Sequence, residues 1–265
     1  MTVGRFNLAK EFDKRYNDER ENSDFVEGRN SVIEALKSGR EINKIMVAKG
    51  TVGSVISIIG KAKEQSIAVQ EVDRAKLDYI SDTGNHQGVI AYVSPKEYVE
   101  VDDILEIAKE KGEDPFIVIL DGVEDGHNLG SILRTADITN VHGVIIPKRR
   151  AVGLNSVVSK ASAGAIEYVP VARVTNLANT IDKLKENGVW VAGTDAEGEQ
   201  SFYEADLSGG IALVIGGEGK GMSRLIHDKC DYILNIPMGG NVNSLNASVA
   251  AGIVMYDIYR NRNKR

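Results

Sequence analysis

The sequence predicts an α/β protein with a small N-terminal unit and a larger unit built on a parallel sheet flanked by helices. Short continuous runs rich in Val and Ile recur along the chain, and segments with helical spacing of apolar residues lie between most of them. A breaker cluster, Gly112 to Pro115, separates two such series. Continuous apolar strands that alternate with helices are typical of parallel sheets buried on both faces.

The small unit is predicted to span residues 25–94. Asn30 or Ser31 is expected to cap its first helix, and the other elements are strands at 42–48, 67–72 and 88–93 and helices at 52–62 and 74–80. Residues 1–24 carry five basic and six acidic side chains and little to bury, which predicts a flexible arm. The arm is either a solvated terminus or a contact for RNA or a partner. Residues 95–114, with a polar helix at 101–111, are predicted to form a linker.

The larger unit is predicted to span residues 115–265. Its expected strands lie at 116–120, 143–146, 169–171, 189–192, 211–215 and 233–236. A last helix, from Ser244 to about Arg260, is apolar almost all round. A helix without a clean polar face is buried in a core or in a subunit interface.

The amino-acid composition limits the cellular compartment and the kinds of binding partner that the protein can have. The net charge of −6, from 32 basic and 38 acidic residues, excludes a polycationic nucleic-acid coat but allows a local basic patch. A single cysteine, Cys230, excludes an intramolecular disulfide and a multi-cysteine zinc site. No uncharged run approaches the roughly 18–20 apolar residues of a membrane span, and the N-terminus lacks a signal-peptide core. We therefore expect a cytoplasmic protein with no membrane partner.

The loop after the strand at 116–120 is the first candidate site, because ligands of open α/β sheets bind beyond the carboxyl ends of the strands. Gly122, Gly126 and Gly130 permit tight turns there. Asn128 can cap the following helix. Arg134 is either a solvated helix charge or a planar clamp for a phosphate or carboxylate.

Two further loops follow later strands. Residues 216–221 hold four glycines in six positions, but the loop is neither a Walker A sequence nor a G-x-G-x-x-G fingerprint. Glu218 in this loop is a solvated carboxylate, a ligand contact or a support for a neighbouring loop. In the third loop, residues 236–246, small and amide side chains precede the last helix, where free N–H groups bind polar ligand atoms or are merely capped.

No metal site is predicted, because none of the four histidines forms a metal-binding pair. His86 and Gln87 lie in a turn before a strand, which is either structural or a ligand contact. The basic run 148–150 follows a strand end and is either a solvated face or a phosphate contact.

Together the three loops resemble the signature motifs of the SpoU (TrmH) family of RNA ribose 2′-O-methyltransferases, within the SPOUT superfamily. The matching segments are NLGSILRTAD, IGGEGKGM and IPMGGNVNSLNASVA. FVEGRNSVIEAL and GNHQGVIA are similar to the N-terminal substrate-binding domain of the RlmB-type members. The resemblance covers roughly residues 25–262.

The resemblance implies S-adenosylmethionine as methyl donor, no metal, a guanosine ribose of 23S ribosomal RNA as substrate, and a homodimer. It also implies that the C-terminal unit forms a deep trefoil knot around the cofactor. It places catalytic roles on Asn128, Arg134, Glu218, Ser244 and Asn246, and cofactor contacts at Thr194, Gly216, Ile236 and Leu245. RNA contacts are expected at His86, Gln87, Lys148 and Arg149.

Three alternatives are weighed against this reading. Transfer RNA is the other substrate class within the family. A ribosome-associated RNA-binding protein without catalysis is disfavoured by the intact set of polar motif residues. A nucleotide enzyme with a Rossmann fold is disfavoured by the missing glycine fingerprint.

Overall fold

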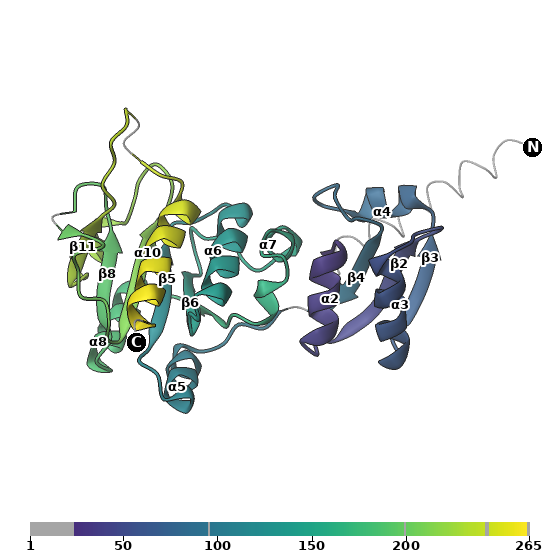
Figure 1. Ribbon diagram of the computed structural model, residues 1–265, viewed down its shortest axis with the longest axis horizontal. Coiled ribbons are helices and arrows are strands. Elements are labelled where there is room, and N and C mark those ends of the chain that lie inside the picture. The colour runs from purple at the N-terminus through teal and green to yellow at the C-terminus, as the bar shows by residue number, and fades with distance from the viewer. Residues whose placement is uncertain (1–23, 95, 199, 242–243, 264–265) are drawn as a thin grey trace, which may run out of the picture. The chain divides into compact units, whose positions relative to one another are not determined.

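The computed structural model describes residues 24–94, 96–198, 200–241 and 244–263, and the chain divides into two compact units (Figure 1). The first unit ends at Pro95 and the second begins at Lys96. The predicted arm, residues 1–24, lies outside the described residues except for Asp24.

The first unit is a four-stranded mixed sheet in the order β1-β4-β2-β3. Strands β2 and β3 are parallel, whereas β4 pairs antiparallel with both β1 and β2. Val, Ile and Ala side chains of the sheet and of the first two helices form one core cluster. The small α/β unit is thereby confirmed, with these elements: β1 (Phe25–Glu27), α2 (Arg29–Lys37), β2 (Ile42–Ala48), α3 (Ser54–Glu64), β3 (Ala68–Val72), α4 (Arg74–Ile80) and β4 (Val89–Val93).

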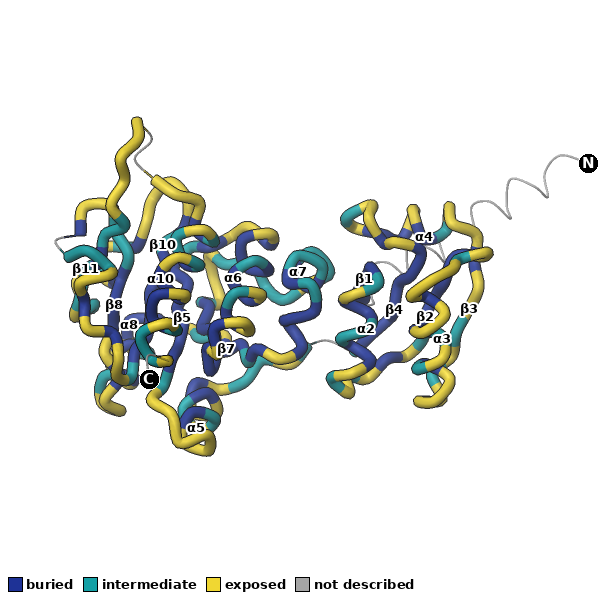
Figure 2. Tube along the Cα trace, in the orientation of Figure 1, coloured by how far each residue is buried: buried dark blue, intermediate teal, exposed yellow. Residues whose placement is uncertain are grey.

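The second unit holds a seven-stranded sheet in the order β7-β6-β5-β10-β8-β11-β9, and every pairing in it is parallel. The predicted parallel sheet is confirmed. Its central strands are almost fully buried (Figure 2). The strands are β5 (Phe116–Asp121), β6 (Gly143–Pro147), β7 (Val171–Val174), β8 (Trp190–Thr194), β9 (Gln200–Ser201), β10 (Ile211–Gly216) and β11 (Tyr232–Asn235).

Helices cover both faces of this sheet, as the side chains of β5 illustrate. Val118 and Leu120 pack with α6 and α10 on one face, while Ile117 and Ile119 pack with α5 and α8 on the other. Among the residues that the structure describes, none of the helices has the length and hydrophobicity of a membrane span. The helices are α5 (Val101–Lys111), α6 (Gly126–Ile138), α7 (Ser156–Ala161), η1 (Ala165–Glu167), α8 (Leu177–Glu186), α9 (Arg224–His227) and α10 (Ala247–Arg262).

The segment predicted as a linker, residues 95–114, belongs largely to the second unit. Val101, Ile104 and Ala108 of α5 are buried, and Val99 forms a parallel bridge with Ala172. The prediction was wrong here because α5 is amphipathic. Its polar residues face solvent, while a narrow apolar face packs on the sheet.

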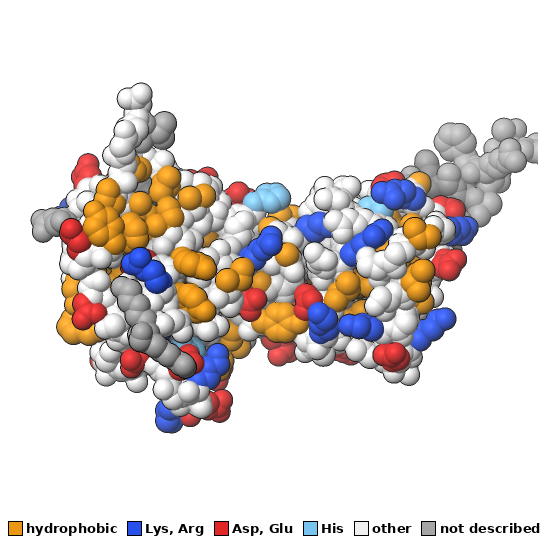
Figure 3. All heavy atoms as spheres, viewed as in Figure 1, with side chains coloured by type: hydrophobic (Ala, Val, Ile, Leu, Met, Phe, Trp, Pro, Cys, Tyr) orange, Lys and Arg blue, Asp and Glu red, His pale blue; other side chains and the backbone are white. Residues whose placement is uncertain are grey.

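The last helix, α10, divides its apolar residues between the core and the surface. Ala251, Val254, Met255 and Ile258 are fully buried against the sheet and α6. Its opposite side exposes an apolar stripe of Val249, Ile253 and Tyr256, spaced four and three residues apart. Figure 3 shows hydrophobic side chains gathered on the face that α10 forms.

His142 is a buried titratable group near the start of the sheet. Its Nδ1 accepts a hydrogen bond from the Phe116 N–H at 2.9 Å, and its Nε2 lies 3.1 Å from the Glu113 carboxylate. Burial lowers the pKa of His142, and the positive charges of Lys111 and Arg262 add to this effect, while Glu113 opposes it. Protonation would also remove the acceptor that Phe116 uses.

We expect His142 to make the protein less stable in acid. Since its folded pKa is lowered below the usual 6.5, the unfolded chain binds the proton more readily. This contribution to stability is intact above about pH 6.5 and falls as the pH drops below that value. Urea unfolding at about pH 7.5 and about pH 5.5 measures the loss. His142→Asn, whose side-chain oxygen still accepts from Phe116 but does not titrate, should show a smaller loss, and an equal loss in both proteins would contradict the assignment.

Candidate functional site

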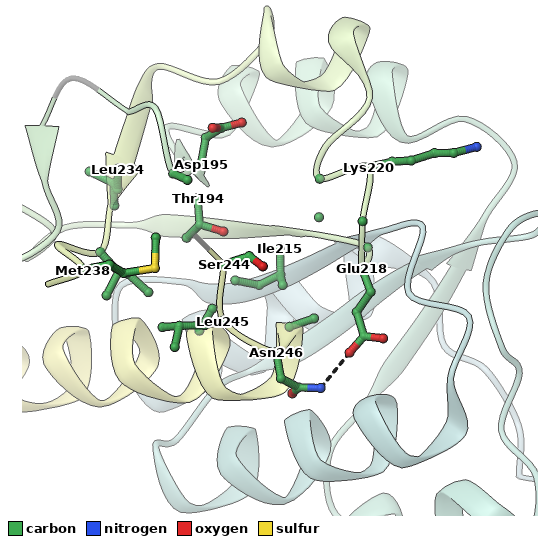
Figure 4. A pocket seen from close by; sticks show the side chains of 18 residues that line it. Thr194, Asp195, Ile215, Glu218, Lys220, Leu234, Met238, Ser244, Leu245 and Asn246 are labelled. Atoms are coloured by element: carbon green, nitrogen blue, oxygen red, sulfur yellow. Dashed lines mark hydrogen bonds between the residues drawn. The ribbon is translucent and has the colours of Figure 1, made fainter. Parts of the chain in front are cut away.

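The loops after β8, β10 and β11 surround a cavity of about 660 Å³ at the carboxyl edge of the sheet (Figure 4). The cavity is lined by all four residues expected to contact a cofactor, which are Thr194, Gly216, Ile236 and Leu245. These residues come together because β10 pairs with β8, and β8 pairs with β11, in parallel. Parallel neighbours bring their carboxyl ends to the same edge.

Two glycines let the second loop approach its neighbours closely. A Cβ atom on Gly217 would lie 2.0 Å from the carbonyl oxygen of Gly122, and one on Gly216 would lie 2.3 Å from the backbone of Gly221. The Gly217 N–H donates to the Asp121 carbonyl oxygen at 2.8 Å. The glycine-rich sequence is therefore required for the backbones of the first and second loops to touch.

Asp121, at the end of β5, links the first loop to the residues that follow the second loop. Its carboxylate is buried and accepts a hydrogen bond from the Ser223 N–H at 2.7 Å. Asp121 was not among the candidate site residues expected from the sequence. The available signal was an acidic residue directly after a buried apolar strand, where a carboxylate needs a partner.

Glu218, Asn128 and Asn246 form a polar network that joins all three loops. One Glu218 carboxylate oxygen accepts a hydrogen bond from the Asn246 amide at 2.6 Å (Figure 4). The same oxygen accepts from the Asn128 amide at 2.9 Å. The Asn246 amide also donates to the Asn128 side-chain oxygen at 3.0 Å. Of the three alternatives for Glu218, the structure supports the one in which it holds neighbouring loops together.

Asn246 also caps α10. Its side-chain oxygen accepts from the N–H groups of Ser248 at 2.9 Å and Val249 at 3.3 Å. The amide end holds the network while the carbonyl end starts the helix, so both ends of the side chain are occupied. Ser244, two residues earlier, lines the cavity and is exposed.

The cavity has the size and lining of a small-molecule site. Ile215, Leu234, Ile236 and Leu245 supply apolar walls. Glu218 and Asp195 add two carboxylates, against one ammonium group from Lys220. It therefore suits a mostly organic ligand that carries a positive charge. Within the described ranges, no group of three or more His, Cys, Asp or Glu side chains is arranged to hold a metal ion.

Arg134 does not line this cavity. It is exposed on α6 and forms no hydrogen bond or ion pair with any residue that the structure describes. Lys148 and Arg149 are exposed directly after β6. The structure thus brings Asn128, Glu218, Ser244 and Asn246 together and leaves Arg134 outside them.

In the first unit, His86 and Gln87 build the turn before β4. The His86 ring is 1% exposed, accepts from the Gly88 N–H at 3.0 Å and lies 2.8 Å from Asp78. Gln87 has a positive φ of 54° and accepts hydrogen bonds from Arg29 through its side chain and its carbonyl. The buried His86 ring therefore positions the turn, and the RNA contacts expected at His86 and Gln87 stay predictions.

Two family models match the chain. Residues 115–256 match the SpoU rRNA Methylase family, and residues 25–99 match the RNA 2′-O ribose methyltransferase substrate-binding domain. The two matches correspond to the two structural units and together span most of the described chain.

Individual relatives agree with these matches. A Bacillus subtilis (strain 168) protein named as a TrmH family tRNA/rRNA methyltransferase, YacO, is 56% identical, over 91% of this chain and 96% of the relative. The structure of an AdoMet-bound rRNA methyltransferase from Sinorhizobium meliloti is 26% identical with a TM-score of 0.73, covering 94% of this chain and 90% of that one. A TrmH/SpoU tRNA modifying enzyme from A. aeolicus is 30% identical with a TM-score of 0.52, covering 57% of this chain and 77% of that one.

Proposed function

The chain belongs to the SpoU (TrmH) family of S-adenosylmethionine-dependent RNA 2′-O-ribose methyltransferases, and we propose that it methylates a guanosine ribose in 23S ribosomal RNA. The share of this chain that each solved structure matches favours ribosomal RNA over transfer RNA as the substrate. The neighbour titled as an rRNA methyltransferase matches 94% of this chain, whereas the tRNA modifying enzyme matches 57%. The name of the Bacillus relative includes both substrates, so transfer RNA is the second candidate.

In this proposal, S-adenosylmethionine binds in the cavity lined by Thr194, Gly216, Ile236 and Leu245. S-Adenosylmethionine supplies a methyl group on a positively charged sulfur. Apolar walls suit its carbon skeleton, and the carboxylates that line the cavity suit its charge. The close approach of the Gly216 backbone to Gly221 leaves no room for a side chain in this wall.

The remaining motif residues are proposed to position the acceptor ribose. Asn128, Glu218, Ser244 and Asn246 would orient the 2′-hydroxyl. Glu218, Ser244 and Asn246 line the cavity, and Asn128 is hydrogen-bonded to Glu218 and Asn246. Arg134 would bind the target phosphate and stabilise negative charge that develops on the 2′-oxygen. A guanidinium stays protonated, so this role suits Arg134 better than removing the proton.

A homodimer is proposed to complete this site. Arg134 lies outside the cavity of its own chain, and Ile138, four residues later, is 58% exposed on the same face of α6. Helix α6 packs on α10, which carries the exposed stripe Val249, Ile253 and Tyr256. Self-association through this stripe covers apolar surface and brings Arg134 toward the cavity of the partner.

A charge in the stripe is expected to separate the subunits and stop methyl transfer. Ile253→Glu places a carboxylate at the centre of the apolar stripe and should yield a monomer by light scattering. An active Ile253→Glu monomer would refute completion of the site by a partner.

Arg134→Ala should remain dimeric and bind S-adenosylmethionine, but its rate of methyl transfer should fall at least about 100-fold. That loss is comparable to the loss of one oxyanion donor.

The trefoil knot is also part of the proposal. Five described residues of the third loop line one cavity with the loop at 194–196 and the loop at 216–221; they are Ile236, Met238, Ser244, Leu245 and Asn246. A chain that passes through the loop it contacts would produce this arrangement. An experimental density map traced through residues 194–247 tests it.

The substrate is tested by methyl transfer from labelled S-adenosylmethionine to unmodified 23S rRNA and, separately, to unmodified tRNA. Ribose methylation is mapped by its resistance to alkaline cleavage. One 2′-O-methylguanosine in 23S rRNA is the expected result. Label in tRNA alone would replace the proposed substrate, and label on a nucleotide other than guanosine would correct the base.

A further inference from the structure

A second cavity, of about 680 Å³, shares a wall with the cofactor cavity. Gly217, Glu218, Lys220 and Gly221 line both cavities, and the second extends over residues 121–125, Asn128 and Arg150. Glu218 therefore stands between the two, held from one side by Asn128 and from the other by Asn246. A reaction that joins two molecules needs two such adjoining spaces.

Two cations line the second cavity, Lys220 and Arg150, and only Arg150 is absent from the cofactor cavity. Arg150 is exposed and has no hydrogen bond or ion pair with any residue in the described part of the chain. Its guanidinium is thus available to a ligand. The carboxylates beside it are mostly engaged: Asp121 accepts from Ser223, Asp125 from His127, and Glu218 from the two amides.

The backbone holds Arg150 in place over this cavity. Its φ of +55° lies in the left-handed region, which bulky side chains rarely adopt. The next residues anchor the loop, because the Val152 N–H donates to the Val123 carbonyl at 3.3 Å and Ala151 and Val152 pack on the core. A strained residue persists where its surroundings impose the conformation, often at a functional site.

We propose that Arg150 binds a phosphate of the acceptor nucleotide in this second cavity and so positions the RNA beside the cofactor. The inference rests on the proposed function and adds a positioning residue to it. A phosphate that enters a cavity with four carboxylates on its walls needs a cation to offset their repulsion. An arginine provides a planar pair of donors for that anion. RNA contacts were expected from the sequence at Lys148 and Arg149, whereas Arg150 is the residue of that basic run that lines the second cavity.

Methyl transfer and cofactor binding by Arg150→Ala test the proposal. The KM for unmodified 23S rRNA should rise about 10- to 100-fold, which is the usual range for losing a hydrogen bond to a charged group. The dissociation constant for S-adenosylmethionine should stay unchanged, because Arg150 does not line the cofactor cavity. The slope of log affinity against log salt should fall by about 1. Arg150→Lys should recover part of the loss.

Three further variants separate the charge of Arg150 from its backbone conformation and from the charge of other exposed arginines. Arg150→Gly relieves the positive φ but removes the guanidinium, so it should be as defective as Arg150→Ala; an active glycine variant would overturn the proposal. Arg224→Ala, an exposed arginine on α9 that lines neither cavity, is the matched control. Equal losses in Arg149→Ala and Arg150→Ala would show a general basic patch and also overturn it.

Failure of the proposed function gives a different result. If the unsubstituted protein methylates neither 23S rRNA nor tRNA, the proposed substrate fails and the role of Arg150 fails with it. If only tRNA is methylated, the same variants are measured on tRNA, where an unchanged KM in Arg150→Ala would overturn the inference alone. Normal transfer to 23S rRNA with an unchanged KM in Arg150→Ala would do the same.

Discussion

Gly217→Ala is expected to abolish S-adenosylmethionine binding and methyl transfer. The added methyl group would lie 2.0 Å from the Gly122 carbonyl oxygen, so the two loops must separate. That movement breaks the hydrogen bond from Gly217 to Asp121 and displaces Glu218 from its two amide partners. Overpacking of this kind costs about 1–3 kcal/mol or more. Calorimetric titration with the cofactor and thermal unfolding measure the two effects.

Gly239→Ala is the matched control for this substitution. Gly239 also follows a strand at the same edge of the sheet, but a Cβ atom there meets nothing within 4 Å and its φ is not in the left-handed region. Its cofactor affinity and melting temperature should stay close to those of the unsubstituted protein. Cofactor binding by Gly217→Ala as tight as by Gly239→Ala would show that the contact between the two loops is dispensable.

Asn246→Asp is expected to retain the fold and lose about 100-fold in the rate of methyl transfer. Aspartate caps a helix as well as asparagine, so α10 keeps its start. The new carboxylate, however, cannot donate to Asn128 or Glu218, and it places a second negative charge within hydrogen-bonding distance of the Glu218 oxygen. The loss corresponds to removing one well-placed donor, about 2.7 kcal/mol or more.

Single-turnover methyl transfer and circular dichroism together measure this outcome. Asn241→Asp makes the same chemical change at an exposed position of the third loop and should leave the rate nearly unchanged. A rate in Asn246→Asp equal to that of Asn241→Asp would indicate that the network is not needed for the reaction. A general loss of helix signal would instead place the effect on the cap.

Much of the fold is visible in the sequence because local pattern and burial agree. The strands at 42–48 and 116–121 and the helices at 74–80 and 101–111 lie where short apolar runs and helical spacing predict them. The assignment of α5 to a linker was wrong, because a narrow apolar stripe does not reveal which surface it packs on. The start of α10 lies at Ala247 rather than Ser244, since Asn246 serves as its cap.

The candidate site, like the fold, was only partly predictable from the sequence. The three loops are recognisable from residue types and spacing alone, and the cavity gathers all the cofactor residues that were expected. Arg134 and Arg150 illustrate the limit. A sequence does not say which of several exposed cations faces a cavity, because that depends on the pairing of strands far apart in the chain.

The sequence by itself determined the two α/β units, the three glycine- and amide-rich loops and the family to which they belong, because these depend on local periodicity and motif order. The tertiary structure decided how the loops meet. Glu218 contacts Asn128, 90 residues away, and Asn246, 28 residues away, and only the parallel order of β5, β10, β8 and β11 brings such distant segments to one edge. It also decided that Arg150 lines a cavity while Arg134 lies outside the cofactor cavity, since side-chain exposure follows from packing and not from spacing along the chain.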